Sequence, residues 1–125
     1  MENGHAAPTR VLVLDDEPSI RLLCRVVFDL EGFEVVEAGS LAEARRALAD
    51  AKLDVVVVDL NLRGERSDEF IAECHAHEPR IPVILVTGSV ELGGDGAPTA
   101  DAVLGKPFEM EELVALVREF AGATP

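Results

Sequence analysis

Residues 55–59 are Val55-Val56-Val57-Val58-Asp59, a β-branched run that ends at a carboxylate. Other apolar runs also end at a polar side chain: Val11-Leu12-Val13-Leu14 precedes Asp15-Asp16, Val83-Ile84-Leu85-Val86 precedes Thr87, and Ala102-Val103-Leu104-Gly105 precedes Lys106. Short apolar runs separated by helix-like stretches are typical of buried parallel strands in an α/β sheet. The sequence therefore predicts an α/β fold with a parallel sheet at its centre.

The polar residues that end these runs are expected to meet at one place. In an open parallel sheet all strand C-termini lie along one edge, and ligands bind in the crevice there. Residues far apart in the sequence would thus bring together three carboxylates, a hydroxyl and an ammonium group. This set of groups suits a divalent cation and a phosphoryl group.

The composition narrows the possible functions. A chain of 125 residues fits one domain with one core, and a hydrophobic content of 48% is that of a folded chain. The formal net charge of -13 argues against binding to nucleic acid or to an anionic membrane surface, because both attract clustered Lys and Arg. Partners with basic patches are expected instead.

The sequence indicates a cytoplasmic protein. No apolar stretch approaches the roughly 20 residues that span a bilayer. Residues 1–9 are expected to form a flexible tail, since the N-terminus lacks the cationic and apolar segments of a secretory signal. Cys24 and Cys74 fall inside helix-like apolar patterns and are expected to be buried thiols in a reducing compartment.

Capping signals place helices between the strands. Pro18 suits the first turn of a helix that stops at Gly32. Ser40 and Glu43 have the spacing of a capping box for a second helix, in which each residue satisfies a backbone N–H of the other. Ser67 is expected to be the N-cap of a third helix.

The segment between the last two strands breaks this regularity. Residues from Gly88 to Pro98 include several glycines and a proline. An interior glycine costs a helix about 1 kcal/mol against alanine, and a proline costs about 3 kcal/mol. The fourth helix is therefore expected to be short or absent.

Together these elements resemble the receiver domain of two-component response regulators. The resemblance runs from Arg10 to Phe120 and rests on the strand-end residues given above, in their order, with Pro107 directly after the lysine. It implies a doubly wound sheet of five parallel strands in the flavodoxin-like order 2-1-3-4-5. It also implies a receiver domain over residues 10–121, with a tail at 122–125. The shortened segment before the last strand is similar to that of a minority class of stand-alone receivers.

The acidic residues supply a candidate nucleophile and candidate metal ligands. Phosphoryl transfer needs an in-line nucleophile and stabilisation of the charge on the phosphoryl oxygens. Asp59 is the candidate nucleophile, and it would form an acyl phosphate. Asp16, and Asp15 through water, would hold Mg²⁺ together with Asp59. The backbone carbonyl of Asn61 would complete the protein ligands, since Mg²⁺ takes oxygen ligands and keeps several waters.

The two remaining site residues would act on the phosphoryl group. Lys106 would offset the repulsion between the carboxylates when the metal is absent, and would contact the phosphoryl group when it is present. Thr87 would donate its hydroxyl to a phosphoryl oxygen and close inward after phosphorylation. The resemblance also implies a cis bond between Lys106 and Pro107. Any one of these residues alone would be an ordinary cap or loop residue, so the interpretation depends on their joint presence.

The chain departs from the family pattern near the site. Arg63 stands where receivers commonly carry proline, and Ser67 stands where they commonly carry glycine. Arg63 is expected to be a solvated loop residue, with contact to the phosphoryl group or to a partner as the alternative. Val103 occupies the position of the aromatic switch residue, and the chain has no Tyr or Trp. We therefore expect the segment Gly88–Pro98 to respond to phosphorylation.

The sequence thus predicts a signalling module that accepts a phosphoryl group on Asp59 and then binds its downstream partner differently. The donor would be a histidine kinase or a histidine phosphotransfer protein. Beyond self-phosphoryl transfer and acyl phosphate hydrolysis, we expect no enzymatic activity. The module is either a stand-alone receiver or one excised from a longer protein.

Two alternatives remain at this point. One is a receiver-like scaffold that acts independently of phosphorylation, although such a scaffold has no need of the complete set of site residues. The other is a phosphatase of the haloacid dehalogenase type, which also uses an Asp nucleophile. Those enzymes start with a D-x-D pattern and have the acidic pair last, whereas here the acidic pair comes first and Asp59-Leu60-Asn61 lacks the second Asp.

Overall fold

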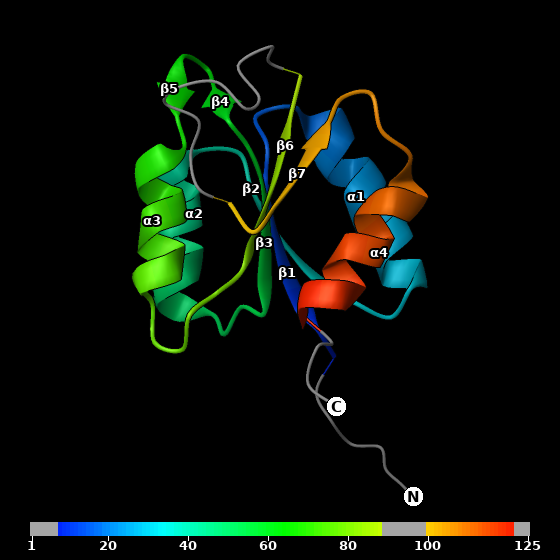
Figure 1. The fold of residues 1–125 in the computed structure, drawn as a ribbon, viewed down its shortest axis with the longest axis horizontal. Helices are drawn as coiled ribbons and strands as arrows, with labels where there is room; N and C mark the ends of the chain where they lie inside the picture. Colours follow the sequence, from blue (N-terminus) through cyan, green and yellow to red (C-terminus); the bar gives the residue numbers. More distant parts are fainter. Residues whose placement is uncertain (1–7, 89–99, 122–125) are drawn as a thin grey trace, which may run out of the picture.

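Five strands form a single sheet in the computed structural model, which describes residues 8–88 and 100–121 (Figure 1). The strands are β1 (Arg10–Leu14), β2 (Glu34–Ala38), β3 (Val55–Asp59), β6 (Val83–Thr87) and β7 (Ala102–Gly105). They lie in the order β2-β1-β3-β6-β7, and every neighbouring pair is parallel. Counted along the chain, this is the order 2-1-3-4-5, so the predicted topology is confirmed.

Both faces of the sheet are covered by helices, which explains the unbroken apolar runs. The odd-numbered residues of β1 pack against α1 (Pro18–Leu30) and α4 (Met110–Ala121). The even-numbered residues pack on the side of α2 (Leu41–Asp50) and α3 (Asp68–Ala76). Figure 1 shows the two pairs of helices on opposite sides of the sheet. A strand that is buried on both faces needs apolar residues at every position rather than at alternate ones.

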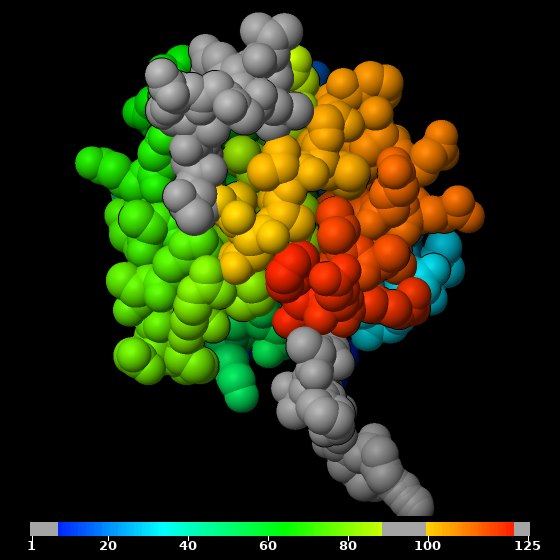
Figure 2. All heavy atoms as spheres, viewed as in Figure 1, coloured from blue at the N-terminus to red at the C-terminus, as the bar shows by residue number. Residues whose placement is uncertain are grey.

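The last strand, β7, lies at the edge of the sheet and reaches the surface. In Figure 2 its yellow-orange atoms are visible between the green atoms of α3 and the red atoms of α4. Val103, at the position of the family's aromatic switch residue, is 48% exposed. A side chain at this position therefore extends toward solvent rather than into the core.

Helix ends follow the capping signals, with two corrections. The first helix is followed by Gly32, whose φ of 90° is one that glycine adopts readily. The hydroxyl of Ser40 accepts the N–H of Glu43 as predicted, but the Glu43 carboxylate accepts the N–H of Gly39 rather than that of Ser40. Ser67 precedes α3 without capping it by its side chain. Its buried hydroxyl instead donates to the carbonyl oxygens of Asp59 (2.9 Å) and Leu60 (3.3 Å), since buried carbonyls at the end of β3 require donors.

A short hairpin follows β3, where the sequence predicted only a loop. It consists of β4 (Asn61–Leu62) and β5 (Glu65–Arg66), which are antiparallel. The two residues between them, Arg63 and Gly64, have φ values of 51° and 87°. Positive φ at both central residues is the requirement of a type I′ turn, which joins strands with little splaying. The pair Arg-Gly is not one of the common sequences for this turn, so the hairpin escaped sequence reasoning.

Several predictions concern residues outside the described part. The N-terminal tail falls there except for residues 8 and 9, and the tail at 122–125 falls there entirely. The segment Gly88–Pro98 was expected to contain a short fourth helix or none, and to respond to phosphorylation. From position 89 onward this segment also lies outside the described residues. The described residues hold the four helices named above.

Both cysteines are buried and free, as the sequence predicted. Burial raises the pKa of Cys24 to about 11 and that of Cys74 to about 12. Neither thiol is therefore ionised at neutral pH, and since the thiolate is the reactive form, both behave as small apolar core residues.

Asp101 ties the start of β7 to the neighbouring strand and to α3. Its carboxylate accepts the backbone N–H of Val83 (2.7 Å) and one bond from the guanidinium of Arg80 (2.8 Å). The ring nitrogen Nε2 of His75, on α3, lies 2.8 Å from the same carboxylate. Burial alone would raise the pKa of Asp101, but these three hydrogen bonds outweigh it and lower the pKa below its usual value.

Asp101→Asn is expected to lower the free energy of unfolding at pH 7 by about 1–2 kcal/mol, because hydrogen bonds to a charged partner are lost. A carboxylate with a lowered pKa makes its full contribution to the stability of the fold above the pKa of an unfolded aspartate, which is about 3.9. It is lost as the pH falls through the lower pKa of the folded protein. Urea unfolding should therefore show a clear difference in the free energy of unfolding between parent and variant at pH 7. This difference should be smaller near pH 3. A difference that is equal at both pH values would contradict the charged role of Asp101.

Candidate functional site

The strand ends bring the acidic residues together as predicted. Asp15 and Asp16 follow β1 and Asp59 ends the neighbouring strand β3, so that one carboxylate oxygen of each lies within 4.8 Å of the others. Asp15 is 4% exposed, whereas the other two are partly buried. This arrangement holds three negative charges in a small crevice at the carboxyl edge of the sheet.

Lys106 lies among these carboxylates. Its Nζ is 2.9 Å from Oδ2 of Asp59 and 3.5 Å from Oδ2 of Asp15. The backbone N–H of Lys106 donates to the carbonyl oxygen of Thr87 (2.9 Å), which places the two residues side by side at the ends of β7 and β6. Thr87 is buried, at 1% exposure. The structure therefore gathers all the predicted side chains at one edge of the sheet.

Burial and charge act in opposite directions on the ionisation of the site. Burial raises the pKa of Asp15, the charges of Asp59 and Asp16 add to that effect, and the N–H of Glu17 and the charge of Lys106 oppose it. Burial alone would lower the pKa of Lys106, but its hydrogen bond to Asp59 and the charges of Asp15 and Asp59 outweigh this and raise it. Lys106 is therefore held in its charged form at neutral pH.

Each of the three carboxylates also accepts a backbone N–H. The N–H of Glu17 donates to Oδ1 of Asp15 (2.9 Å), and that of Asn61 donates to Oδ1 of Asp59 (3.3 Å). The N–H of Arg63, at the tip of the hairpin, donates to Oδ2 of Asp16 (3.1 Å). These bonds fix the orientation of the acids through the chain itself. That the carbonyl of Asn61 is a metal ligand stays a prediction.

Arg63 is well exposed, as predicted, and it also lies near the acidic site. Its Nε lies 4.0 Å from Oδ2 of Asp16, although the side chain is 78% exposed. The contact depends on the hairpin, which turns the chain after β3 back over the acidic residues. Sequence reasoning left contact with the phosphoryl group open as an alternative but had no signal for the hairpin.

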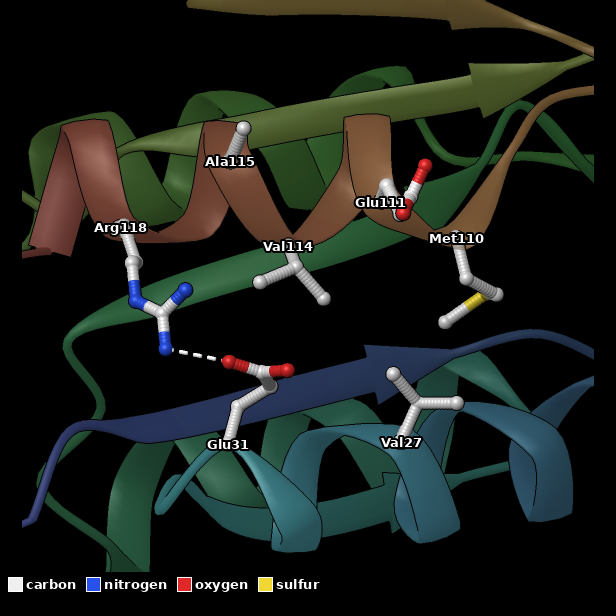
Figure 3. Close-up of a pocket in the computed structure, with 7 residues that line it drawn as sticks. All are labelled: Val27, Glu31, Met110, Glu111, Val114, Ala115 and Arg118. Atoms are coloured by element: carbon white, nitrogen blue, oxygen red, sulfur yellow. Dashed lines mark hydrogen bonds and ion pairs between the residues drawn. The ribbon is translucent and has the colours of Figure 1, made fainter.

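Exposed apolar side chains of the described residues gather on α1, outside the acidic cluster. Four apolar side chains of this helix are well exposed: Leu22 (61%), Leu23 (47%), Val26 (50%) and Leu30 (82%). A groove of about 470 Å³ adjoins them between α1 and α4 (Figure 3). Figure 3 shows Val27, Val114 and Met110 along the groove and an ion pair between Glu31 and Arg118 across one end of it. The helix that carries this apolar face begins at Pro18, two residues after Asp16 of the acidic cluster.

Comparison with known proteins identifies the family. The family model described as "Response regulator receiver domain" matches residues 11–118 of the chain. The chain belongs to this family. As a receiver domain of two-component response regulators it is a signalling module, and its acidic cluster occupies the place expected for the phosphoaccepting aspartate and its neighbours.

The receiver domain is similar to parts of longer curated proteins. It is 34% identical over 118 residues to the regulatory protein AtoC of Escherichia coli K12, covering 90% of this chain and 25% of that protein. It is 31% identical over 119 residues to the DNA-binding response regulator MtrA of Mycolicibacterium smegmatis, covering 87% of this chain and 49% of MtrA. The chain thus spans from about a quarter to about half of the length of these relatives.

Solved structures show the same fold over nearly their whole length. One is the response regulator TrrA of Thermotoga maritima, determined in complex with Mg²⁺ and BeF, at a TM-score of 0.80 and 29% identity, covering 90% of this chain and 98% of that chain. Another is the chemotaxis response regulator CheY4 of Vibrio cholerae, at a TM-score of 0.79 and 25% identity, with the same two coverages of 90% and 98%. The Lys106–Pro107 bond of the receiver domain is cis, as the resemblance implied. Within the described ranges, no helix combines the length and apolar character needed to cross a membrane.

Asp15→Asn is expected to raise the melting temperature of the receiver domain measured in EDTA. A buried carboxyl with a raised pKa holds its proton more tightly in the folded state, so its ionisation at neutral pH opposes folding. The amide oxygen can still accept the N–H of Glu17. A gain on the order of 1 kcal/mol would shift the melting temperature by roughly 4 °C.

Asp29→Asn is a matched control, since it removes the same charge from the exposed side of α1. It is expected to change the melting temperature much less. If Asp15→Asn lowers the melting temperature, then pairing of Asp15 with Lys106 outweighs the effect of burial.

Proposed function

We propose that this receiver domain accepts a phosphoryl group on Asp59 from a histidine kinase or a histidine phosphotransfer protein, in a reaction that requires Mg²⁺. The observation that supports this most directly is that Asp59 lies beside a lysine ammonium and two further carboxylates. An oxygen of Asp59 attacks the phosphorus in line, the phosphorus–nitrogen bond of the donor's phosphohistidine breaks, and its electron pair stays with the imidazole. The product is an acyl phosphate.

The donor set fits Mg²⁺. Asp15, Asp16 and Asp59 offer carboxylate oxygens from separate residues within 4.8 Å of one another, and Mg²⁺ binds through few carboxylates and several waters. We infer that Asp16, Asp59 and the backbone carbonyl of Asn61 hold the ion directly, and that Asp15 holds it through water. When bound, Mg²⁺ neutralises the charge that develops on the phosphoryl oxygens.

We infer that Lys106 and Thr87 act on the same phosphoryl oxygens. Lys106 is charged and already within hydrogen-bonding distance of Asp59, so a phosphoryl group on that residue gains a cation without a large rearrangement. Thr87 ends the adjacent strand β6 and offers a hydroxyl donor from a buried position. We infer that both residues orient the phosphoryl group.

The exposed apolar face of α1 is the surface that we assign to the phosphoryl donor. A protein donor must bring its phosphohistidine to Asp59, and α1 begins two residues after Asp16, which belongs to the same acidic cluster. Exposed apolar side chains in this number on one helix are more than scattered surface residues, and such patches mark interaction sites. The occupant we propose is an apolar helix face with basic flanks, because the receiver domain carries a net charge of -13.

The two alternatives from the sequence are not favoured. A haloacid-dehalogenase-like phosphatase does not accord with the family match over residues 11–118. A phosphorylation-independent scaffold leaves the paired lysine and the three carboxylates without a role. The absence of further enzymatic activity, the cytoplasmic location and the downstream partner stay predictions.

Incubation with Mg²⁺ and phosphoramidate is expected to add one phosphoryl group to the parent, as measured by intact mass. Asp59→Asn should abolish the increment, and EDTA should abolish it in the parent, because the transition-state charge needs the cation. Asp16→Asn should require much more Mg²⁺ for the same yield, whereas Asp29→Asn should behave as the parent. Full labelling of Asp59→Asn would show that the phosphoacceptor lies elsewhere.

Leu22→Asp is expected to slow transfer from a phosphorylated protein donor by at least about fivefold, because a charge would be placed in an apolar contact. Labelling by phosphoramidate should be unchanged, since a small donor does not need α1. Val103→Asp is the matched control, an exposed apolar residue on the far edge strand β7. Equal slowing by both substitutions would remove α1 from donor binding.

A further inference from the structure

The β4–β5 hairpin contacts the acidic site at two points. Near its base, the N–H of Asn61 donates to Asp59, and at its tip the N–H of Arg63 donates to Asp16. Leu62, between these residues, is 3% exposed and anchors the hairpin in the core. Figure 1 shows the hairpin at the end of the molecule where β6 and β7 also terminate. The position of its tip is therefore fixed relative to the carboxylates.

The side chain of Arg63 lies beside the same oxygen that its backbone N–H contacts. Its Nε is 4.0 Å from Oδ2 of Asp16, while 78% of the side chain is exposed and free of packing that would hold it there. The other arginine of the hairpin, Arg66, pairs with Asp68 on α3 at 2.8 Å instead. Of these two cations, Arg63 faces the acidic crevice.

The backbone at Arg63 suits a different residue. Its φ of 51° is in the left-handed region, where glycine or asparagine is favoured and a long side chain has no conformational advantage. A type I′ turn is formed most readily by Asn-Gly, so an arginine at this position is a local compromise. Such a compromise is consistent with a role for the guanidinium rather than for the turn.

Metal binding would change the surroundings of Arg63. Mg²⁺ needs a carboxylate oxygen of the acidic cluster, and a guanidinium beside Asp16 competes with it for that negative charge. After phosphorylation the site contains additional anionic oxygens, for which the planar guanidinium is a suitable bidentate donor. The exposed side chain can turn toward them without disturbing the core.

We propose that Arg63 exchanges partners during the phosphorylation cycle. In the metal-free site its guanidinium lies beside Asp16 and competes weakly with Mg²⁺ for that carboxylate. In the phosphorylated, Mg²⁺-bound site it binds the phosphoryl oxygens. The inference rests on the proposed phosphorylation of Asp59. It makes Arg63 a second phosphoryl-binding cation, contributed by the hairpin and additional to Lys106.

Arg63→Asn is the variant of choice, because it removes the guanidinium while favouring the backbone of the turn. In a Mg²⁺ titration followed by two-dimensional NMR, its dissociation constant for Mg²⁺ should fall about two- to fivefold, the range for loss of an exposed ion pair. Arg66→Asn removes the same charge from the same hairpin and should leave Mg²⁺ affinity close to that of the parent. If Mg²⁺ affinity rises equally in both variants, the effect comes from net charge alone and the proposal is overturned.

The second arm measures binding of beryllofluoride, a phosphoryl mimic, at saturating Mg²⁺. Arg63→Asn should weaken beryllofluoride binding by at least about threefold, whereas the same substitution strengthens Mg²⁺ binding. Arg66→Asn should leave beryllofluoride binding unchanged. If the parent binds beryllofluoride and Arg63→Asn binds it equally well, the partner exchange is wrong while the proposed function stands. If the parent neither binds beryllofluoride nor labels with phosphoramidate, the proposed function itself fails.

Discussion

Repulsion among three carboxylates held within 4.8 Å of one another is the constraint around which the edge of this sheet is arranged. Lys106 offsets part of it through contacts of 2.9 and 3.5 Å with Asp59 and Asp15. Backbone N–H groups offset a further part, one to each acid, from the turn after β1 and from the hairpin after β3. The remaining negative charge is what a divalent cation would neutralise.

The sheet and the site followed from the sequence because both depend on strand order. Double-sided burial requires apolar runs such as Val55–Val58, and these runs place the residue after each strand at a common edge. No contact had to be known to bring Asp15, Asp59 and Lys106 together. The family resemblance then supplied the predicted role of each residue.

What the sequence did not predict lies in contacts that no periodicity encodes. Ser67 had the spacing of an N-cap, but its hydroxyl binds carbonyl oxygens at the end of β3, because burial leaves those oxygens without water. The hairpin depends on a positive φ at Arg63, and an arginine gives no sequence signal for that backbone conformation. Asp101 joins β6, β7 and α3 through hydrogen bonds between residues that lie up to 26 positions apart in the chain.

The exposed apolar face of α1 belongs to a chain with a formal net charge of -13. Two copies that approach each other through this face are subject to like-charge repulsion, which acts over a screening length of about 8–10 Å at physiological ionic strength. A partner with basic flanks is attracted over the same distance. Net charge therefore disfavours self-association and favours encounter with a basic partner before any side chains touch. It keeps a protein with an exposed apolar helix from aggregating through that helix.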